Sequence, residues 1–190
     1  MKSLNTPAKI QDFLNSLKFN FEDKGETNYS VRYVLKHRKA QCFEGALLGA
    51  AALWIQGHKP LLLDLKTVRP DFDHVVALFK VDGFWGALSK TNHSVLRYRE
   101  PVYKSVRELA MSYFHEYFLP SGKKTLRSYS KPFDISKYGN IWMVSEEDLA
   151  WLAHELDKSP HIKILTSKQI GNLRTADRVE IKAGELSEYT

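Results

Sequence analysis

Residues 42–57, CFEGALLGAAALWIQG, decide how this chain folds. They are small and apolar on nearly every side of a helix, and Gly57 stands where a helix C-cap is expected. A helix of this kind belongs inside a domain, where other elements cover all of its faces. Gly45 and Gly49, four positions apart, leave one flank without side chains, so another element can approach that flank closely. The sequence therefore predicts a central, buried helix that begins at Cys42.

Short strands and further helices are predicted on both sides of this helix. Apolar runs bounded by turn residues indicate strands at 61–65, 74–79, 84–88, 94–98 and 162–165. The dipeptide Asp82-Gly83 is typical of a two-residue hairpin turn, here between the second and third of these strands. Caps and apolar periodicity, including a capping box at 145–148, indicate helices at 7–18, 31–35, 106–117 and 145–156. The expected fold class is α+β, with the helix at 42–57 packed on an antiparallel sheet built from about 61–98.

Length and composition fit one domain. The chain has 190 residues, of which 43% are hydrophobic and 26% are charged, so it holds enough apolar surface for a single buried core. We expect one domain over residues 1–190, with its core at about 30–120. The role of a C-terminal extension at about 121–190 is not indicated by the sequence, nor is the oligomeric state.

Charge and cysteine content narrow the classes of function. The net charge is +6, yet the densest basic run, residues 36–39, lacks interleaved aromatics, and no nucleic-acid-binding motif accompanies it. A single cysteine forms no intramolecular disulfide, and the first residues do not form the apolar segment of a signal peptide. No run approaches the roughly 18 apolar residues that span a bilayer. We therefore expect a cytoplasmic protein with neither nucleic acid nor membrane as a partner.

Cys42 and His74 are the candidate catalytic pair. Cys42 is predicted at the positive end of a helix dipole, which lowers a thiol pKa and favours the thiolate, and Arg38 or Lys39 would act in the same direction. Unpaired backbone amides at this helix start, together with the Gln41 side chain, are candidates to hold an oxyanion. His74 opens a following strand, and histidine is the side chain best able to take a thiol proton near neutral pH. Each residue taken alone is more often structural.

The combination of these motifs resembles the core of the transglutaminase-like superfamily, with its papain-like cysteine chemistry. In that core a cysteine opens a helix, a histidine opens a strand, and a strand that contains tryptophan ends in an acidic residue. The matching segments, within about residues 30–91, are RKAQCFEGA at 38–46, GHKP at 57–60, DH at 73–74 and GFWGALSKT at 83–91. The resemblance implies peptidase, amidase, hydrolase or acyltransferase activity.

The acidic residue of that pattern is missing, and Ser89 stands in its place. The predicted hairpin register brings Ser89 near His74, where its hydroxyl can accept the imidazole N–H bond but supplies no negative charge. Asn92 is an alternative residue to orient the ring. By the resemblance, Trp85 is expected to line the cleft beside Cys42.

The sequence thus predicts a cysteine-nucleophile hydrolase or acyltransferase that acts on a peptide, a protein or a small amide or ester. We expect no cofactor and no metal, because neither His115 nor His154 is followed by a second histidine at metal-binding spacing. The alternative is a catalytically weak or inactive module that keeps the cleft after losing the acid. The reactivity of the Cys42 thiol separates these two hypotheses.

Overall fold

Helix α3 begins and ends close to where its sequence predicts, at Cys42–Ile55, in a computed structural model that describes residues 3–189. Residues 43–53 are all buried, as expected for a helix without a polar face. Gly57 follows with a φ of 89°, a left-handed conformation that suits glycine and ends the helix. The outer sides of α3 are covered by α1 (Pro7–Asn15), α2 (Val31–His37) and α5 (Ile141–Val144).

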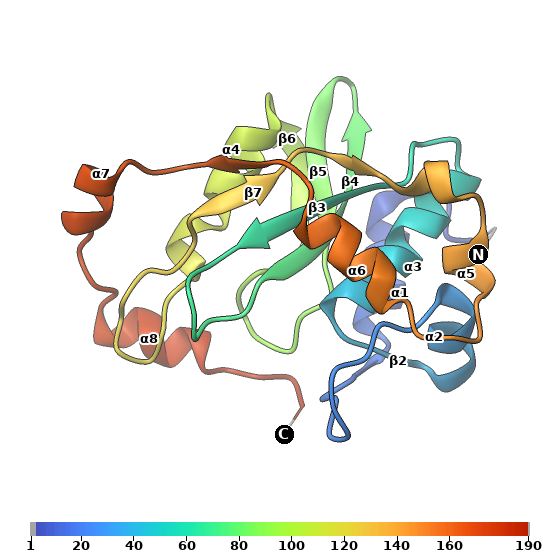
Figure 1. Ribbon diagram of the computed structural model, residues 1–190, viewed down its shortest axis with the longest axis horizontal. Coiled ribbons are helices and arrows are strands. Elements are labelled where there is room, and N and C mark those ends of the chain that lie inside the picture. The colour runs from blue at the N-terminus through green and yellow to red at the C-terminus, as the bar shows by residue number, and fades with distance from the viewer. Residues whose placement is uncertain (1–2, 190) are drawn as a thin grey trace.

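The inner side of α3 packs on an antiparallel sheet with strand order β6-β5-β4-β3-β7-β9 (Figure 1). Its strands are β3 (Leu61–Lys66), β4 (His74–Val81), β5 (Phe84–Leu88), β6 (Arg99–Tyr103), β7 (Ser128–Ser130) and β9 (His161–Lys163), and β8 (Phe133–Asp134) pairs with the start of β3. A separate parallel pair joins β1 (Lys18–Phe19) to β2 (Lys39–Ala40). The predicted α+β class with a large antiparallel sheet is confirmed.

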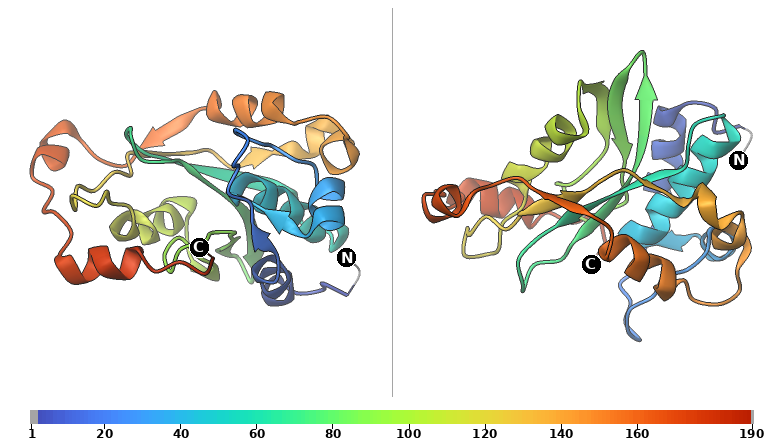
Figure 2. Two further views of the ribbon diagram at one scale, coloured as in Figure 1. Left: turned by 90° about the horizontal axis from the view of Figure 1, so that it is seen from below. Right: turned by 45° about the horizontal axis from the view of Figure 1, so that its top comes forward.

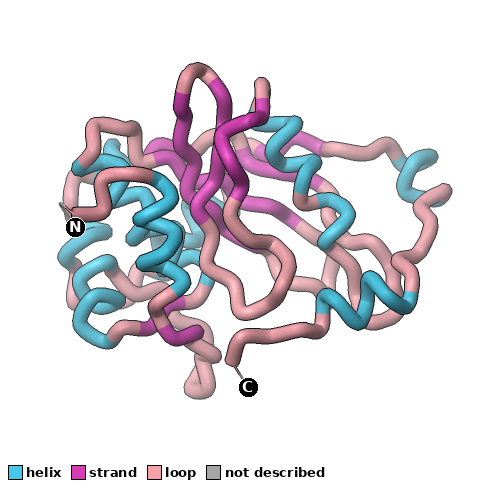
Figure 3. Tube along the Cα trace, turned by 180° about the vertical axis from the view of Figure 1, so that it is seen from behind, coloured by secondary structure: helices cyan, strands magenta, loops and turns pink. Residues whose placement is uncertain are grey.

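The sheet separates two hydrophobic cores, and Figure 3 shows the strands between two groups of helices. On one side α1, α2, α3, α5 and α6 (Ala150–Asp157) pack against Val75, Ala77 and Phe79 of β4. On the other side α4 (Val106–Ser112) and the 3-10 turn η1 (Phe114–Glu116) pack against Val76 and Leu78. Because side chains alternate along a strand, β4 contributes to both cores.

The remaining helices lie outside these two cores or at their margins: the 3-10 turn η2 (Ile135–Tyr138), α7 (Ser167–Gly171) and α8 (Arg178–Gly184). After α8 the chain returns to the loop that follows β5, so the C-terminal end lies beside that loop (Figure 2). Within residues 3–189, every helix is too short or too polar to cross a membrane.

The hairpin between β4 and β5 forms in the predicted register. Asp82 and Gly83 have φ values of 50° and 85°, as a two-residue turn of this type requires. The ladder pairs Val81 with Phe84 at the turn and Ala77 with Leu88 at its far end. If the register continues beyond the ladder, Ser89 lies opposite Val76. His74 is two residues from Val76 along β4, so its side chain lies on the same face of the sheet.

Several element predictions beyond the hairpin were wrong. Residues 94–98 form a loop instead of a strand, because Leu96 is left-handed, with a φ of 59°, and the N–H of Ser94 bonds to the C-terminal segment. The helix expected at 106–117 ends at Ser112 and continues as η1. The capping box expected at 145–148 does not form: these residues make a bend before α6, and Asp148 accepts N–H bonds from Ala150 and Asn28, each at 2.8 Å.

The predicted core at 30–120 was too narrow. Strands β7 and β9, from the segment expected as an extension, complete one side of the sheet. Trp142, Leu149 and Leu152 are fully buried in the same core as α3, which also takes Ile10 and Leu14 from α1. These contacts join residues far apart in sequence, which local patterns do not predict.

The close packing of α3 on the sheet gives a first prediction. A β-carbon at Gly45 would lie 2.4 Å from the β-carbon of Lys90, so Gly45→Ala forces a shift in the helix or in the strand end. We expect this variant to lose roughly 1–2 kcal/mol of unfolding free energy in urea titrations, since overpacking exceeds the helix-propensity gain of alanine. Gly171→Ala, where nothing lies within 4 Å, is the matched control and is expected to be neutral or slightly stabilising. Equal stability of the two variants would contradict this view of the packing.

Candidate active site

Local hydrogen bonds fix the start of α3, where Cys42 lies. The Gln41 side-chain oxygen accepts the N–H of Phe43 at 2.6 Å, and the Glu44 carboxylate accepts the N–H of Gln41 at 2.9 Å. These two bonds form a capping box, which satisfies donors that a helix start leaves open. Glu44 is fully buried and also accepts bonds from the segment that precedes α2, through Asn20, Thr27 and Tyr29.

The Cys42 thiol lies among protein atoms, although the residue as a whole is only half-buried. Burial raises the thiol pKa to about 11, and the N–H groups of Val75 and Phe43 lower it only in part. The charges that act on the thiol are carboxylates, those of Glu22 and Asp64, and they raise the pKa further. The expectation of a lowered thiol pKa was therefore wrong, because desolvation outweighs the helix dipole here.

Neither Arg38 nor Lys39 is among the charges that act on the thiol, and Arg38 points away from it. Its guanidinium lies 4.7 Å from the centre of the Phe13 ring and donates to the Ser16 hydroxyl at 3.1 Å. Arg38 thereby binds helix α1 and its C-cap residue, and the charges that act on the thiol are those of carboxylates.

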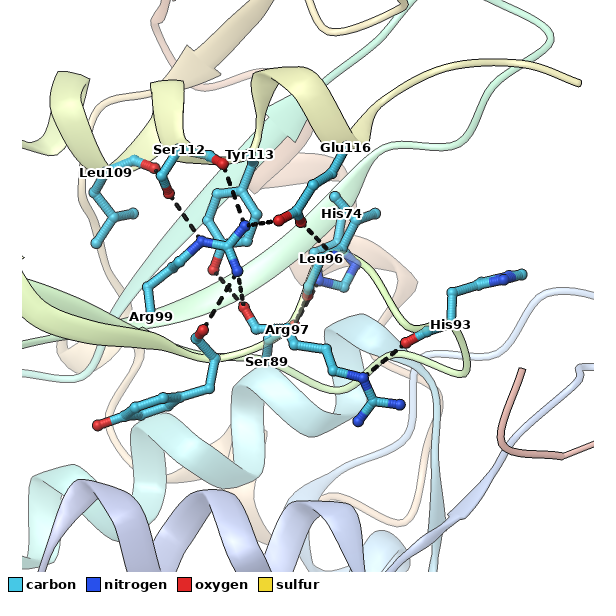
Figure 4. A network of polar contacts seen from close by, with 11 residues as sticks. His74, Ser89, His93, Leu96, Arg97, Arg99, Leu109, Ser112, Tyr113 and Glu116 are labelled. Atoms are coloured by element: carbon cyan, nitrogen blue, oxygen red, sulfur yellow. Dashed lines mark hydrogen bonds and ion pairs between the residues drawn. The ribbon is translucent and has the colours of Figure 1, made fainter. Parts of the chain in front are cut away.

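His74 and Ser89 meet as the hairpin register predicts. The Nε2 atom of His74 lies 2.8 Å from the Ser89 hydroxyl, and that hydroxyl donates its proton to the carbonyl of Leu96 (Figure 4). Since a serine has one hydroxyl proton, its oxygen accepts from the imidazole, and the proton of a neutral ring is therefore on Nε2. This tautomer leaves Nδ1 with a free lone pair, as a general base needs.

The backbone of Ser89 is held by helix α1 instead of by β4. Gln11 accepts the Ser89 N–H at 3.0 Å and donates to the Ser89 carbonyl at 2.7 Å. One side-chain amide thus takes the place of a strand partner where the ladder stops. The ladder between β4 and β5 ends at the pair Ala77–Leu88, before it reaches His74, and the two bonds from Gln11 hold Ser89 in place beyond that point.

An acidic residue does take part in this network, at one remove from the imidazole. Glu116 accepts the N–H of Leu96 at 2.7 Å and pairs with Arg99 at 2.6 Å, as Figure 4 shows. These contacts hold Leu96 in its left-handed conformation, with its carbonyl on Ser89. Glu116 is therefore a positioning residue for the loop and does not contact His74 in the hydrogen bonds of the described chain.

His74 is neutral at physiological pH. The residue is 5% exposed, and burial lowers its pKa to about 4, helped by the positive charge of Arg99. The Leu96 carbonyl raises the pKa, because its dipole stabilises the protonated ring, but by less than burial lowers it. With a neutral thiol and a neutral imidazole, the resting site holds no thiolate–imidazolium ion pair.

The thiol and the imidazole both lie at the start of β4. The thiol accepts the N–H of Val75, and the His74 ring contacts Ser89 and lies near Leu96. No hydrogen bond joins Cys42 to His74 among residues 3–189. The two groups are thus neighbours along β4 and do not form a closed pair.

Three other predicted site residues have different places. Asn92 does not orient His74, because its amide exchanges two bonds of 2.9 Å with the backbone of Tyr189. Gln41 caps α3 and donates to the Thr27 carbonyl at 2.8 Å, so its amide is already engaged at both ends. Trp85 does not line a cleft beside Cys42; it pairs with Lys80 near the hairpin turn, about 20 Å along β4 from His74 at the usual rise per residue.

A group of carboxylates lies near the other edge of the site. Asp64, Asp73 and Asp157 have oxygens that all lie within 4.8 Å of one another. The ammonium of Lys66 pairs with Asp157, and His161 bonds to Asp64 at 3.0 Å. Lys66 and His161 therefore already bind two of the three carboxylates.

Sequence reasoning missed the residues that complete the site from the far side of the sheet. Leu96, Arg99, Glu116 and Tyr117 reach it only through the loop after β5 and through η1. The dipeptide His115-Glu116 drew attention only as a fragment of a metal-binding helix, and nothing local marks Leu96 as left-handed. No protein-family model matches this sequence, and a search of curated proteins returned no match.

The low pKa of His74 predicts a dependence of stability on acid. A histidine pKa of about 4 in the folded chain, against about 6.5 unfolded, contributes stability that is complete above pH 6.5 and is lost as the pH falls toward 4. The loss is about 3 kcal/mol over this window. His74→Gln keeps a hydrogen-bonding group without this titration, so denaturant titrations at pH 4.5 and 7 should differ less for the variant. An equal pH dependence in both chains would show that His74 is not buried in its neutral form.

The raised thiol pKa predicts slow alkylation of the folded chain. At pH 8, iodoacetamide should modify Cys42 roughly 100-fold more slowly than free cysteine, because the thiolate fraction is correspondingly smaller. The rate should climb as the pH approaches 11. The chain unfolded in urea, with the same single cysteine, is the control for the reagent. A rate that levels off below pH 8.5 would contradict the buried thiol.

Proposed function

We propose that this chain is a cysteine-dependent acyl hydrolase or acyltransferase, with Cys42 as nucleophile, His74 as general base and Ser89 as the residue that orients the base. One observation carries the proposal. The Ser89 hydroxyl, committed to Leu96 on one side, accepts the Nε2 proton of His74 at 2.8 Å and so leaves Nδ1 free.

The resting protonation states define the mechanism. The Sγ atom of Cys42 attacks the carbonyl carbon of an amide or ester while Nδ1 of His74 takes the thiol proton. The tetrahedral intermediate then collapses to a thioester, and the imidazolium returns the proton to the departing amine or alcohol. Water hydrolyses the thioester, or an amine takes the acyl group. General-base catalysis of this kind requires no preformed thiolate.

The transglutaminase-like resemblance supports the same assignment of roles. Cys42 is the first residue of α3, His74 is the first residue of β4, and Ser89 directly follows β5. This is the order of the corresponding residues in that superfamily's core. Ser89 occupies the position of the usual acid. The substrate class that follows is a peptide, a protein or a small amide or ester, with no cofactor.

The inactive binding module is the second candidate, and the electrostatics of the site favour it. The thiol pKa of about 11 opposes nucleophilic reactivity, and Gln41 and Trp85 are not placed to complete a catalytic cleft. Under this hypothesis the bond between His74 and Ser89 serves only to hold the loop after β5.

Acylation by p-nitrophenyl acetate separates the two candidates. We expect the wild type to release nitrophenolate and to form an acetyl thioester on Cys42, identified by mass spectrometry of the trapped protein. The acylation rate should rise with an inflection near pH 4 and stay level through neutral pH, because His74 is the base. His74→Gln should lose this level region, and Ser89→Ala should lower it by roughly 10- to 100-fold.

Cys42→Ala is the control for acylation elsewhere on the chain. If the wild type is acylated no faster than His74→Gln at every pH, the hydrolase proposal is rejected and the inactive binding module remains. A thioester that forms equally well with alanine at position 89 would remove Ser89 from the mechanism while retaining the Cys42 nucleophile.

A further inference from the structure

Tyr117 carries a buried hydroxyl without a hydrogen-bond partner. The residue is 2% exposed, and its hydroxyl binds no other group within residues 3–189. A buried hydroxyl in this state destabilises the fold relative to a phenylalanine of the same shape. The neighbouring Tyr113, also fully buried, shows the usual solution, because its hydroxyl donates to the Arg97 carbonyl at 3.1 Å.

The backbone places Tyr117 between the two segments that flank His74. Glu116, the preceding residue, binds Leu96 in the loop after β5. The Tyr117 carbonyl accepts the N–H of Thr125 at 3.1 Å, and the Thr125 side chain binds Asp71 in the loop before β4. The loop before β4 and the loop after β5 are thus both connected by hydrogen bonds to residues 116 and 117, the first through Thr125.

The ring of Tyr117 lies in the core on the His74 side of the sheet. The ring belongs to the same core as Leu65 and Val76, which are the strand partner and the next same-face neighbour of His74. The Cys42 thiol is among the groups whose charge raises the pKa of the Tyr117 hydroxyl. Burial keeps its pKa well above the ordinary value, so the phenol retains its proton at every pH at which His74 is a base.

We propose that the Tyr117 hydroxyl donates a hydrogen bond to the oxyanion that forms when Cys42 attacks an acyl group. As the bond from Sγ to the carbonyl carbon forms, the carbonyl electron pair moves to oxygen, and the thiol proton passes to His74. When the carbonyl re-forms, the leaving group departs with that proton, and Tyr117 keeps its own throughout. The inference rests on the proposed function and assigns the oxyanion role that the sequence had given to Gln41.

A preformed donor is suited to this role because it gains a partner only in the transition state. Interactions made in the transition state alone accelerate the reaction, whereas those made equally in the ground state do not. The N–H of Cys42, at the first position of α3 and without an intrahelical acceptor, is available as a second donor.

Tyr117→Phe tests the inference, with Tyr138→Phe as a matched control. Tyr138 packs against the other core, and its hydroxyl makes a 3.4 Å contact with Glu155. For Tyr117→Phe we expect a melting temperature equal to or above that of the wild type, an unchanged rate of alkylation by iodoacetamide, and acylation by p-nitrophenyl acetate slowed roughly 100-fold. Alkylation forms no oxyanion, so the ratio of the two rates isolates the proposed bond.

Tyr138→Phe should leave both rates as they are in the wild type. Acylation of Tyr117→Phe at the wild-type rate would overturn the inference and leave the Cys42 nucleophile in place. Equal losses of acylation and alkylation would also overturn it, since they indicate a change in the thiol itself. A wild type that forms no thioester would overturn the proposed function, and the role of Tyr117 with it.

Discussion

Helix α3 lies so close to the end of β5 that a β-carbon at Gly45 would stand 2.4 Å from that of Lys90. Lys90 is 1% exposed, and its aliphatic stem covers this glycine while its ammonium reaches the Leu17 carbonyl at 2.6 Å. Because side chains alternate, the residue before it, Ser89, points to the opposite face, toward His74. One close contact therefore sets both the depth of the helix that carries Cys42 and the direction of the residue that orients the imidazole.

The start of α3 depends on a buried carboxylate. Glu44 gains enough donors, from Gln41, Asn20, Thr27 and Tyr29, to remain in a fully buried position, although desolvation still raises its pKa. A capping box gives the helix a fixed first turn and commits the Gln41 amide to that purpose. The same bonds that position the Cys42 thiol thus engage the Gln41 amide at both ends, so that this side chain is not free to contact a ligand.

Local patterns were sufficient for the parts of the fold that form local contacts. The apolar run at 42–57 gave the central helix, and Asp82-Gly83 gave a hairpin whose register brings Ser89 to His74. The loop at 94–98 and the residues after 120 were not predictable in this way, because their conformations are fixed by partners far along the chain. Glu116 holds Leu96 across the sheet, and β7 and β9 add to β3 from beyond residue 120. The predicted direction of the thiol pKa shift was wrong for a similar reason, because the burial that raises this pKa depends on the whole fold.

Desolvation decides the chemistry of the site. A helix dipole stabilises an anion by about 1 kcal/mol, whereas a thiol pKa of about 11 in place of 9.0 corresponds to roughly 3 kcal/mol against the thiolate. The imidazole is disfavoured as a cation by a similar amount, with Arg99 nearby and no carboxylate of residues 3–189 hydrogen-bonded to the ring. Burial lowers the His74 pKa to about 4, and the Ser89 hydroxyl that contacts the ring adds no negative charge to offset this effect. In such a site an orienting hydroxyl is sufficient for the resting state, and charge develops only as the thiol proton moves, which makes donors that meet the new oxyanion the main electrostatic contribution to the reaction we propose.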